Sequence, residues 1–351
     1  MKRCFILILA AALCLSGCGK QEKEASAQIF AMDTVMEIAA FGPQAEEAVS
    51  ETESQIQELE KQLSRTLPDS DVSRINRNGT TPTTGIAAGT WALLEAALEY
   101  GDATDGAFDI TIAPVMDAWG FTGDSFRVPE RSELDELLKH VNSDEIQIQE
   151  EPAHSVTLGE GQAIDLGGIA KGYTSDLVEQ TFRANGIESG KISLGGNVFV
   201  LGGKPDGSDW RVGIKDPRNE SGLAAILSLR DAYAITSGGY ERYFEENGKT
   251  YHHIIDPSTG YPADSGLLSV TVVAADNGPD WAGAGNGAMC DAFSTALFVM
   301  GEEQALDFWR NGGYDFDLVL VTEDGRVVVT AGLADRFEEV KDSGYTYETV
   351  S

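Results

Sequence analysis

The ten-residue segment from Ile164 to Tyr173, IDLGGIAKGY, restricts the fold of this chain more than any other. Its pattern predicts a short buried strand, then a glycine turn, then a helix. Asp165 stands at the end of the predicted strand, and Lys171 lies in the first helical turn. Such a turn directs backbone N–H groups, a helix N-terminus and a cation at one point, which suits a phosphate or pyrophosphate. For this segment alone, an ordinary strand-to-helix turn remains the alternative.

The start of the chain has the pattern of a secretory leader. Residues 1–17 open with two basic residues and continue with an apolar run that is too short to span a bilayer as a mature helix. The run ends in Leu15-Ser16-Gly17-Cys18, which resembles the bacterial lipobox, so we expect cleavage before Cys18 and lipidation of this cysteine. A secretory signal without lipid is the alternative. Residues 18–28 are polar and are expected to form a flexible tether. The expected location is the extracytoplasmic face of the cell membrane, which is the periplasm in a Gram-negative cell.

Charge and cysteine content limit the partners of the folded part. The chain carries a net charge of −32, and loss of the two basic residues of the leader gives −32 − 2 = −34. Nucleic acid and anionic lipid are therefore poor partners for the general surface, apart from the lipid anchor itself. An anionic ligand needs local cations, backbone amides or a bound metal ion. Because Cys290 is the one cysteine left in the folded part, neither an intrachain disulfide nor a cysteine metal cluster is expected.

Residues 29–350 are expected to form one domain, since they show no internal repeat, low-complexity segment or linker. Residues 43–63 have the apolar stripe of a long amphipathic helix, and a hairpin is predicted around Glu323-Asp324-Gly325. Short strands and helices alternate without a regular βαβ pattern, which predicts an α+β fold. The other expected helices are 91–100, 130–141, 169–184 and 292–300, and the other expected strands include 29–41, 155–158, 163–166, 191–194, 198–201, 210–214, 224–229 and 268–275.

A second group of polar residues lies near the C-terminal end. Asp291 and Thr295 are four residues apart and share a helix face, and Ser294 lies beside them. One carboxylate with two hydroxyls offers the hard oxygen ligands that Mg²⁺ prefers, with substrate phosphates and water completing the shell. The alternative is that Asp291 caps a helix N-terminus while the hydroxyls bond to the backbone.

Two further segments offer candidate residues. His253 precedes the turn sequence Asp256-Pro257-Ser258-Thr259-Gly260, where it could serve as a general base or as a hydrogen-bonded loop residue. The segment Gly106-Ala107-Phe108-Asp109 could line an aromatic ligand or fill the core.

Taken together and in this order, these motifs resemble the ApbE family, the FAD:protein FMN transferases. The resemblance covers essentially the whole domain. It is carried by Ala31-Met32-Asp33-Thr34, by Asp71 to Asn76, by Gly106 to Asp109, by Asp165 to Tyr173, by Ser193 to Asn197, by Thr236-Ser237-Gly238, by His253 to Gly260 and by Asp291 to Thr295. It implies an ApbE-like sandwich of largely antiparallel sheets with flanking helices, related to the T-fold.

The resemblance also implies roles for single residues. FAD contacts are implied at Met32, Thr66, Ala107, Phe108, Asp109, Asp165, Lys171 and Ile255. Mg²⁺ ligands are implied at Asp291, Ser294 and Thr295 and at the backbone carbonyl of Gly168. His253 matches a histidine that helps to activate the incoming hydroxyl.

The implied reaction transfers FMN from FAD to a Thr or Ser hydroxyl of an extracytoplasmic redox protein and releases AMP. Two alternatives stay open, namely a Mg²⁺-dependent FAD pyrophosphatase and a non-catalytic flavin-binding lipoprotein. The glycine-rich loop 280–289 is expected to be a mobile flap that closes over the site.

Overall fold

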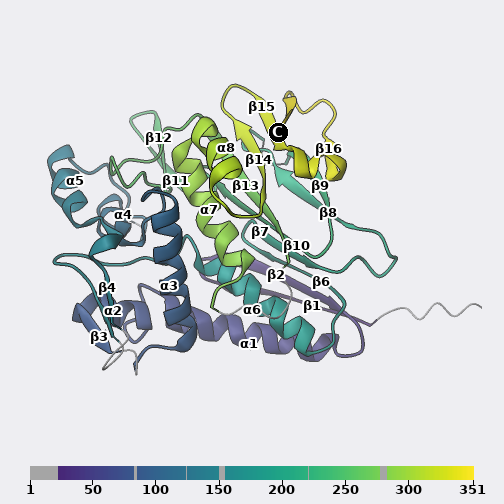
Figure 1. The fold of residues 1–351 in the computed structure, drawn as a ribbon, viewed down its shortest axis with the longest axis horizontal. Coiled ribbons are helices and arrows are strands. Elements are labelled where there is room, and N and C mark those ends of the chain that lie inside the picture. The colour runs from purple at the N-terminus through teal and green to yellow at the C-terminus, as the bar shows by residue number, and fades with distance from the viewer. Residues whose placement is uncertain (1–22, 83–84, 124, 150–154, 220, 277–282) are drawn as a thin grey trace, which may run out of the picture.

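The computed structural model describes residues 23–82, 85–123, 125–149, 155–219, 221–276 and 283–351. Its centre is a nine-stranded sheet with the order β1-β2-β6-β7-β10-β13-β14-β15-β17 (Figure 1). Within it, neighbouring strands pair antiparallel except for the parallel pair of β15 and β17. The strands are β1 Glu24–Ala31, β2 Thr34–Phe41, β6 Ser189–Leu194, β7 Asn197–Leu201, β10 Ala232–Gly238, β13 Leu267–Ala275, β14 Asp317–Thr322, β15 Arg326–Thr330 and β17 Thr346–Val350.

Smaller sheets and eight α-helices complete the described part of the chain. The helices are α1 Ala45–Leu63, α2 Asp71–Asn78, α3 Ala88–Ala103, α4 Ala113–Trp119, α5 Arg131–Leu137, α6 Ala170–Ala184, α7 Asn286–Met300 and α8 Glu302–Asn311. The small sheets contain β8 Trp210–Lys215, β9 Leu223–Leu229 and β16 Phe337–Glu339, then β3 Thr80–Pro82, β4 Gln147–Gln149 and β5 Ser155–Thr157, then β11 Tyr243–Glu246 and β12 Lys249–His252. Among the described residues, none of these helices has the length and apolar character that a bilayer crossing needs.

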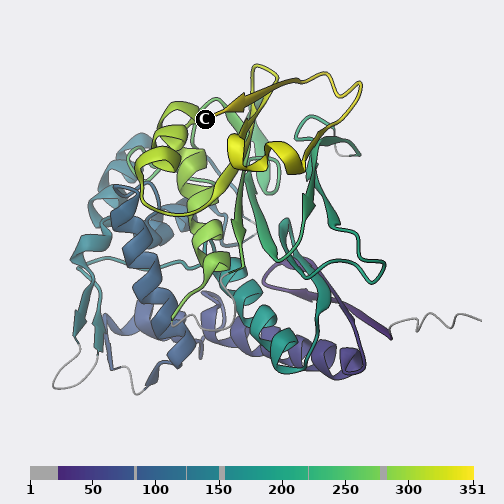
Figure 2. The same cartoon turned by 45° about the vertical axis from the view of Figure 1, so that its right-hand side comes forward.

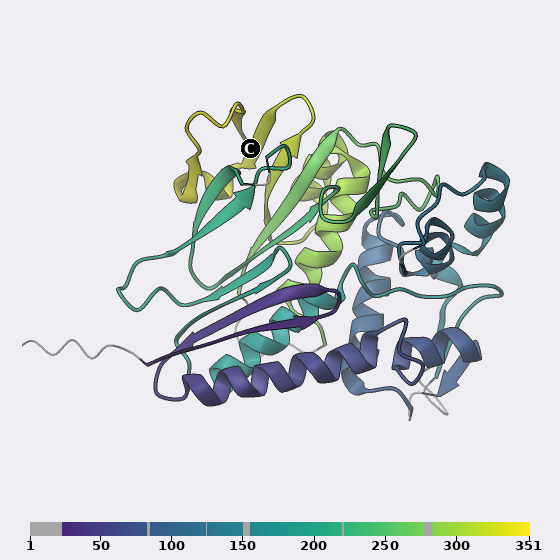
Figure 3. The ribbon, with the colours of Figure 1, turned by 180° about the vertical axis from the view of Figure 1, so that it is seen from behind.

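The middle strands of the large sheet, β7, β10, β13, β14 and β15, are buried on both faces, and their alternating side chains build two cores. Tyr233 and Ile235 of β10 point into the core shared with helices α1, α6 and α7. Ala232 and Ala234 point into a second core, which is formed with the sheet of β8, β9 and β16. This division follows from the two-residue period of a strand. Figure 1 shows α6 and α7 in front of strands of the large sheet, Figure 2 shows the same arrangement turned by 45°, and Figure 3 shows the molecule from behind.

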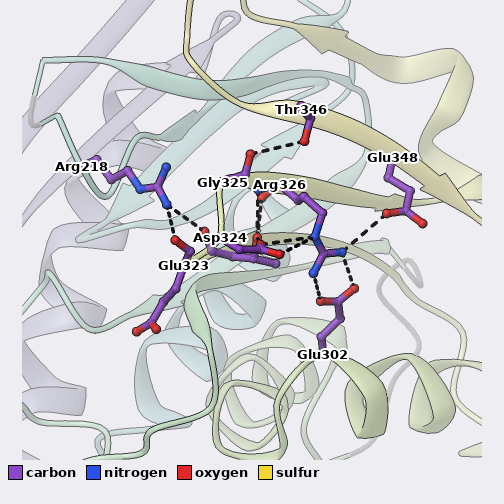
Figure 4. A network of polar contacts seen from close by, with 9 residues as sticks. Arg218, Glu302, Glu323, Asp324, Gly325, Arg326, Thr346 and Glu348 are labelled. Carbon is purple, nitrogen blue, oxygen red and sulfur yellow. Dashed lines mark hydrogen bonds and ion pairs between the residues drawn. The ribbon is translucent and has the colours of Figure 1, made fainter.

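The C-terminal strand is tied to the sheet by a polar network around Arg326 (Figure 4). The guanidinium donates to Glu302 of α8 at 2.8 Å and to Asp324 at 3.0 Å, and it lies 3.5 Å from Glu348 of β17. One cation thus joins the helix, the β14–β15 turn and the last strand. None of these partners belongs to the motifs that suggested a function, and we assign the network a structural role.

Most expected elements are confirmed, and three are corrected. Helices α1 and α6 and the β14–β15 hairpin lie where the sequence predicted them. The expected strand 29–41 is instead a hairpin, because Met32 and Asp33 form a two-residue turn between β1 and β2. Strand β1 begins at Glu24, so residues 24–28 of the predicted tether are paired with β2. The predicted leader, 1–17, lies outside the described residues.

The third correction concerns residues 163–166, which form no strand. Their backbone is held by a side chain instead of a neighbouring strand. The amide of Asn76 accepts from the Ile164 N–H at 2.8 Å and donates to the Ile164 carbonyl at 2.9 Å. The Asp165 N–H donates to the carbonyl of Ile110 at 2.7 Å. Both backbone polar groups of Ile164 and the N–H of Asp165 are therefore satisfied without a sheet.

Candidate functional site

The glycine turn before α6 uses most of its own amide groups. The N–H of Gly167 donates to Oδ1 of Asp165 at 2.8 Å, and that of Gly172 donates to Oδ2 of Asp291 at 2.8 Å. The N–H groups of Ile169 and Ala170 bond to the carbonyl of Leu166. The predicted cradle of free amides is therefore largely occupied by protein acceptors. The helix N-terminus and the Lys171 ammonium are left as the attraction for an anion.

Asp291 lies inside α7 and does not cap it, because the helix begins at Asn286 with Gly285 as its N-cap residue. The capping alternative is therefore wrong. The residue is only 3% exposed. Its Oδ2 accepts from Gly172, and its Oδ1 lies 3.9 Å from the Lys171 ammonium, which is too long for a hydrogen bond. Lys171 instead donates to the carbonyl of Gly167 at 3.4 Å. Oδ1 of Asp291 therefore lies beside the glycine turn and makes no hydrogen bond to Lys171.

Three hydroxyls meet next to Asp291. The hydroxyl of Ser237, near the end of β10, lies 2.8 Å from that of Ser294 and 3.2 Å from that of Thr295. Ser294 also donates to the Asp291 carbonyl at 2.9 Å. A Cβ placed on Gly168 would lie 3.6 Å from Oγ1 of Thr295, so the glycine turn touches the cluster. Ser237 lies in the motif Thr236-Ser237-Gly238, but no role was predicted for it. Only the fold shows that it faces α7.

The donor chemistry of this cluster fits a hard divalent cation. Asp291 supplies one carboxylate, Thr295 and Ser294 supply hydroxyls, and Gly168 belongs to the adjoining turn. Oxygen donors with few charges suit Mg²⁺, which usually retains water and substrate oxygens. In the part of the chain that the structure describes, no group of three His, Cys, Asp or Glu side chains could hold a metal ion by itself.

His253 is held as a neutral base by its surroundings. Its Nδ1 lies 3.2 Å from the carbonyl of Arg242, which can only accept, so this nitrogen carries the proton and Nε2 keeps its lone pair. Burial lowers the pKa of His253 to about 4, and the positive charge of Lys171 acts in the same direction. The imidazole is therefore uncharged at neutral pH. Its ring also contacts Phe121, with centroids 6.4 Å apart.

Ile255 lies two residues further on, in an aromatic cluster that fixes the turn after His253. The residue is buried against Trp119, whose indole N–H donates to the Gly260 carbonyl at 2.7 Å. Asp256 accepts from the N–H and the hydroxyl of Ser258, as expected for a rigid turn. The turn thus anchors the histidine, while the side chain of Ile255 serves the core.

The segment of Ala107, Phe108 and Asp109 lies against the same glycine turn. A Cβ on Gly168 would come within 3.1 Å of the Phe108 ring, which is buried. Ala107 packs at the edge of the main core. The carboxylate of Asp109 caps the 3-10 helix Ile110–Ile112, accepting from the Thr111 N–H at 2.7 Å and from the Ser143 N–H at 3.0 Å.

Asp165 has a partner that the sequence analysis did not identify. Arg65 donates to Oδ2 of Asp165 at 3.0 Å and to both oxygens of Asp117 at 2.8 and 2.9 Å. Its side chain is only 10% exposed. Thr66, the predicted contact, is exposed and bonds to Ser64. In this loop the contact to Asp165 is therefore made by Arg65, the residue before Thr66.

Met32 occupies the hairpin turn in a backbone conformation that side chains rarely adopt, with φ of 50°. Its N–H donates to Glu60 at 2.8 Å, and its sulfur lies 3.7 Å from the hydroxyl of Thr174 on α6. Glu60 thus holds the turn in place. Met32 is therefore brought to α6 one turn after Lys171.

A groove with a volume of about 560 Å³ lies beside this hairpin turn, between β8 and the uncovered part of the large sheet. Thr236 lines it, whereas its neighbour Ser237 reaches the hydroxyl cluster. Because successive residues of a strand point to opposite faces, the groove and the cluster lie on opposite faces of the sheet. The groove is thus separate from the candidate metal position.

Part of the predicted flap, residues 280–289, is helical. Residues 286–289 form the first turn of α7, and residues 280–282 lie outside the described part of the chain. Helical hydrogen bonds and the contacts of Gly287 and Ala288 described below hold this end in place.

Comparisons with known proteins match this chain to one family. The ApbE family model matches residues 32–319. The FAD:protein FMN transferase of Treponema pallidum is 32% identical over 315 residues, which cover 86% of this chain and 84% of that protein. One from Klebsiella pneumoniae is 33% identical, with 83% and 86% covered. Among solved structures, the ApbE protein of Thermotoga maritima has a TM-score of 0.77 at 32% identity, covering 91% of this chain and 97% of its own. The apo flavinyl transferase ApbE of Pseudomonas stutzeri has a TM-score of 0.73 at 30% identity, with 87% and 93% covered.

Proposed function

The chain belongs to the ApbE family, and from this premise we propose that it is an enzyme that transfers FMN from FAD to a protein. We further propose that the acceptor is a Thr or Ser hydroxyl and that the reaction depends on Mg²⁺ and releases AMP. The observation that carries the proposal is the convergence of Lys171, Asp291 and Thr295 at the start of α6. A cation, a buried carboxylate and hydroxyls at one helix N-terminus suit a pyrophosphate and its counter-ion.

Asp291, Thr295, Ser294 and the carbonyl of Gly168 would hold the magnesium ion. Bound there, it would neutralise charge on the phosphoryl oxygens of the substrate. The other groups act on the substrate directly. Lys171 binds a phosphate oxygen, and the ring of Phe108 packs against the turn at Gly168. The remaining proposed FAD contacts are Met32, Thr66, Ala107, Asp109, Asp165 and Ile255. Among them, Asp109 and Asp165 also hold nearby backbone through hydrogen bonds.

His253 is the proposed general base. Its neutral Nε2 can accept the proton of the incoming hydroxyl, which has a high pKa and is a poor nucleophile while protonated. The acceptor oxygen then forms a new bond to the phosphorus on the FMN side, and the bond to the AMP oxygen breaks. The products are a phosphodiester-linked flavin on the acceptor and AMP, so atoms and charge balance.

A positioned acceptor hydroxyl reacts faster than water, because binding holds it in line with the phosphorus. The proposed partner is an extracytoplasmic redox protein that carries FMN. The location rests on the Leu15 to Cys18 pattern, and we propose that lipid on Cys18 tethers the enzyme to the cell membrane.

The test combines the purified enzyme, FAD and a threonine-bearing flavoprotein acceptor, with Mg²⁺ or with a chelator. We expect flavin fluorescence that stays on the denatured acceptor only when Mg²⁺ is present. Free FMN and AMP without labelled acceptor would support the pyrophosphatase instead. FAD binding without any product would support the non-catalytic lipoprotein.

A further inference from the structure

Asp176 is a carboxylate buried inside the contact between α6 and α7. It is 0% exposed and lies on α6, one turn after Gly172. Its Oδ1 accepts from the N–H of Gly287 at 2.7 Å, and its Oδ2 accepts from the N–H groups of Gly285 and Ala288 at 3.0 Å each. These amides belong to the first turn of α7, which has no side-chain cap of its own. A residue of one helix thus caps the other.

The two helices touch closely at the same place. A Cβ on Gly172 would lie 2.1 Å from the Gly287 carbonyl oxygen, and a Cβ on Gly287 would lie 2.4 Å from that of Gly172. The Gly172 N–H also donates to Asp291. Helix α6 therefore contacts α7 at two positions that are one turn apart. Asp176 bonds to the first turn of α7, and Gly172 bonds to Asp291.

From this geometry we infer that Asp176 is a positioning residue for the proposed magnesium site, because it fixes the register of α7 along α6. It does not touch the substrate. If α7 slid or its first turn frayed, Asp291 and Thr295 would move relative to Gly168 and Lys171. The inference rests on the proposed function, since it takes Asp291 and Thr295 as ligands.

The chemistry of the cap explains why a carboxylate is needed. The three amides and the hydroxyl of Tyr233, which also bonds to Asp176, are all donors. A carboxylate is a pure acceptor with two oxygens, whereas an amide side chain would turn an NH₂ group toward at least one of these donors. The negative charge also complements the helix N-terminus.

The test compares Asp176→Asn and Tyr233→Phe with the parent enzyme. The readouts are the Mg²⁺ dissociation constant, from calorimetric titration of the FAD-bound enzyme, and the Mg²⁺ concentration that gives half-maximal FMN transfer, both measured well below each melting temperature. We expect an increase of at least tenfold for Asp176→Asn. A smaller increase, about twofold to fivefold, is expected for Tyr233→Phe, which keeps the ring and removes one donor. If Asp176→Asn does not fold, the result for Tyr233→Phe alone decides.

Asp71→Asn is the matched control. Asp71 is also a buried acid that holds the start of another helix, accepting from the Ala87 N–H at 2.8 Å and from the Thr90 hydroxyl at 2.7 Å. We expect lower stability and an unchanged Mg²⁺ requirement. If Asp176→Asn and Tyr233→Phe also lower only the melting temperature, the inference is overturned. A parent enzyme that needs no Mg²⁺ would instead overturn the proposed metal dependence.

Discussion

The backbone N–H of Gly172 donates to Oδ2 of Asp291 across the contact between α6 and α7, at 2.8 Å. An amide of the glycine turn thus orients a carboxylate and is not available to a phosphate. The bond aims the second oxygen of Asp291 toward Lys171, 3.9 Å away. Positive and negative groups are held beside one another before any substrate arrives. Such preorganisation lowers the cost of arranging charges during the reaction.

Replacing Asp291 by asparagine removes the negative charge but keeps an acceptor for the hydrogen bond from Gly172. We expect Asp291→Asn to keep an acceptor for Gly172 and most of its stability, while FMN transfer falls at least 100-fold. Asp291→Ala leaves the buried Gly172 N–H without that acceptor, which costs roughly 1–3 kcal/mol in addition. Thermal melts and transfer rates on both variants check this. Substantial Mg²⁺-dependent transfer by Asp291→Asn would argue against a charged metal ligand.

The hydroxyl of Thr295 can be removed without changing its shape. We expect Thr295→Val to raise the half-saturating Mg²⁺ concentration about tenfold, because an oxygen donor is replaced by a methyl group. Thr295→Ser restores the hydroxyl and should restore the Mg²⁺ requirement. The measurement is the dependence of transfer rate on Mg²⁺ at saturating FAD. Equal curves for the parent and the valine variant would remove Thr295 from the metal site.

The lowered pKa of His253 determines how we expect activity and stability to depend on pH. Because its pKa in the folded protein is about 4, the neutral base persists in mildly acidic solution, and the acid limb of kcat/KM lies well below an ordinary histidine pKa near 6.5. The unfolded state binds the proton first, so the stability from this group is full above about pH 6.5 and is lost as the pH falls toward 4.

Two variants test this assignment. His253→Asn should lower transfer about 10²-fold or more and remove the acid limb. Lys171→Met should move the limb to higher pH, because a nearby positive charge is lost. A limb that keeps its position in Lys171→Met would show that these two residues do not interact.

Arg65→Met leaves Asp165 and Asp117 without their shared cation. We expect a loss of roughly 2 kcal/mol in stability and weaker FAD binding, because charge-assisted hydrogen bonds to the turn disappear. Arg211→Met is the control, since its pair with Glu338 lies on the surface, with both side chains about half exposed, and should contribute less than about 1 kcal/mol. Calorimetric FAD titration and chemical unfolding measure both effects. Unchanged FAD affinity in Arg65→Met would limit the pair to a structural role.

Cys18→Ala should release the protein from membranes and leave the soluble domain active. Lipid on this cysteine is the proposed anchor, and the first strand of the described part of the chain begins at Glu24. Cys14→Ala is the control, because this residue is expected to leave with the signal peptide. Detergent partitioning of both variants gives the result. Equal partitioning of Cys18→Ala and the parent would contradict lipidation.

The elements that could be predicted from the sequence are those that depend on local patterns. The stripe of α1, the helix after the glycine turn and the turn at Glu323-Asp324-Gly325 are each set by neighbours in the chain, and the structure confirms them. Residues 163–166 could not be predicted in this way. Their apolar character resembles a buried strand, but the partner of their backbone is Asn76, a side chain about 90 residues away.

The candidate site shows the same division. Asp291, Thr295 and Lys171 were found from motifs, and the structure brings them together. Whether Asp291 capped a helix depended on where α7 begins, and glycines at 285 and 287 hide that start in the sequence. Arg65 and Asp176 were missed because their partners are distant in the chain and become neighbours only through the fold.

The most direct test of the central claim is intact-protein mass spectrometry of the acceptor after incubation with enzyme, FAD and Mg²⁺, with AMP counted in the same reaction. The account predicts that each labelled acceptor gains one FMN less one water and that one AMP appears for each label. Fragmentation should place the label on a Thr or Ser side chain, and changing that residue to alanine should abolish it. AMP and free FMN in equal amounts, with the acceptor mass unchanged, would contradict the account.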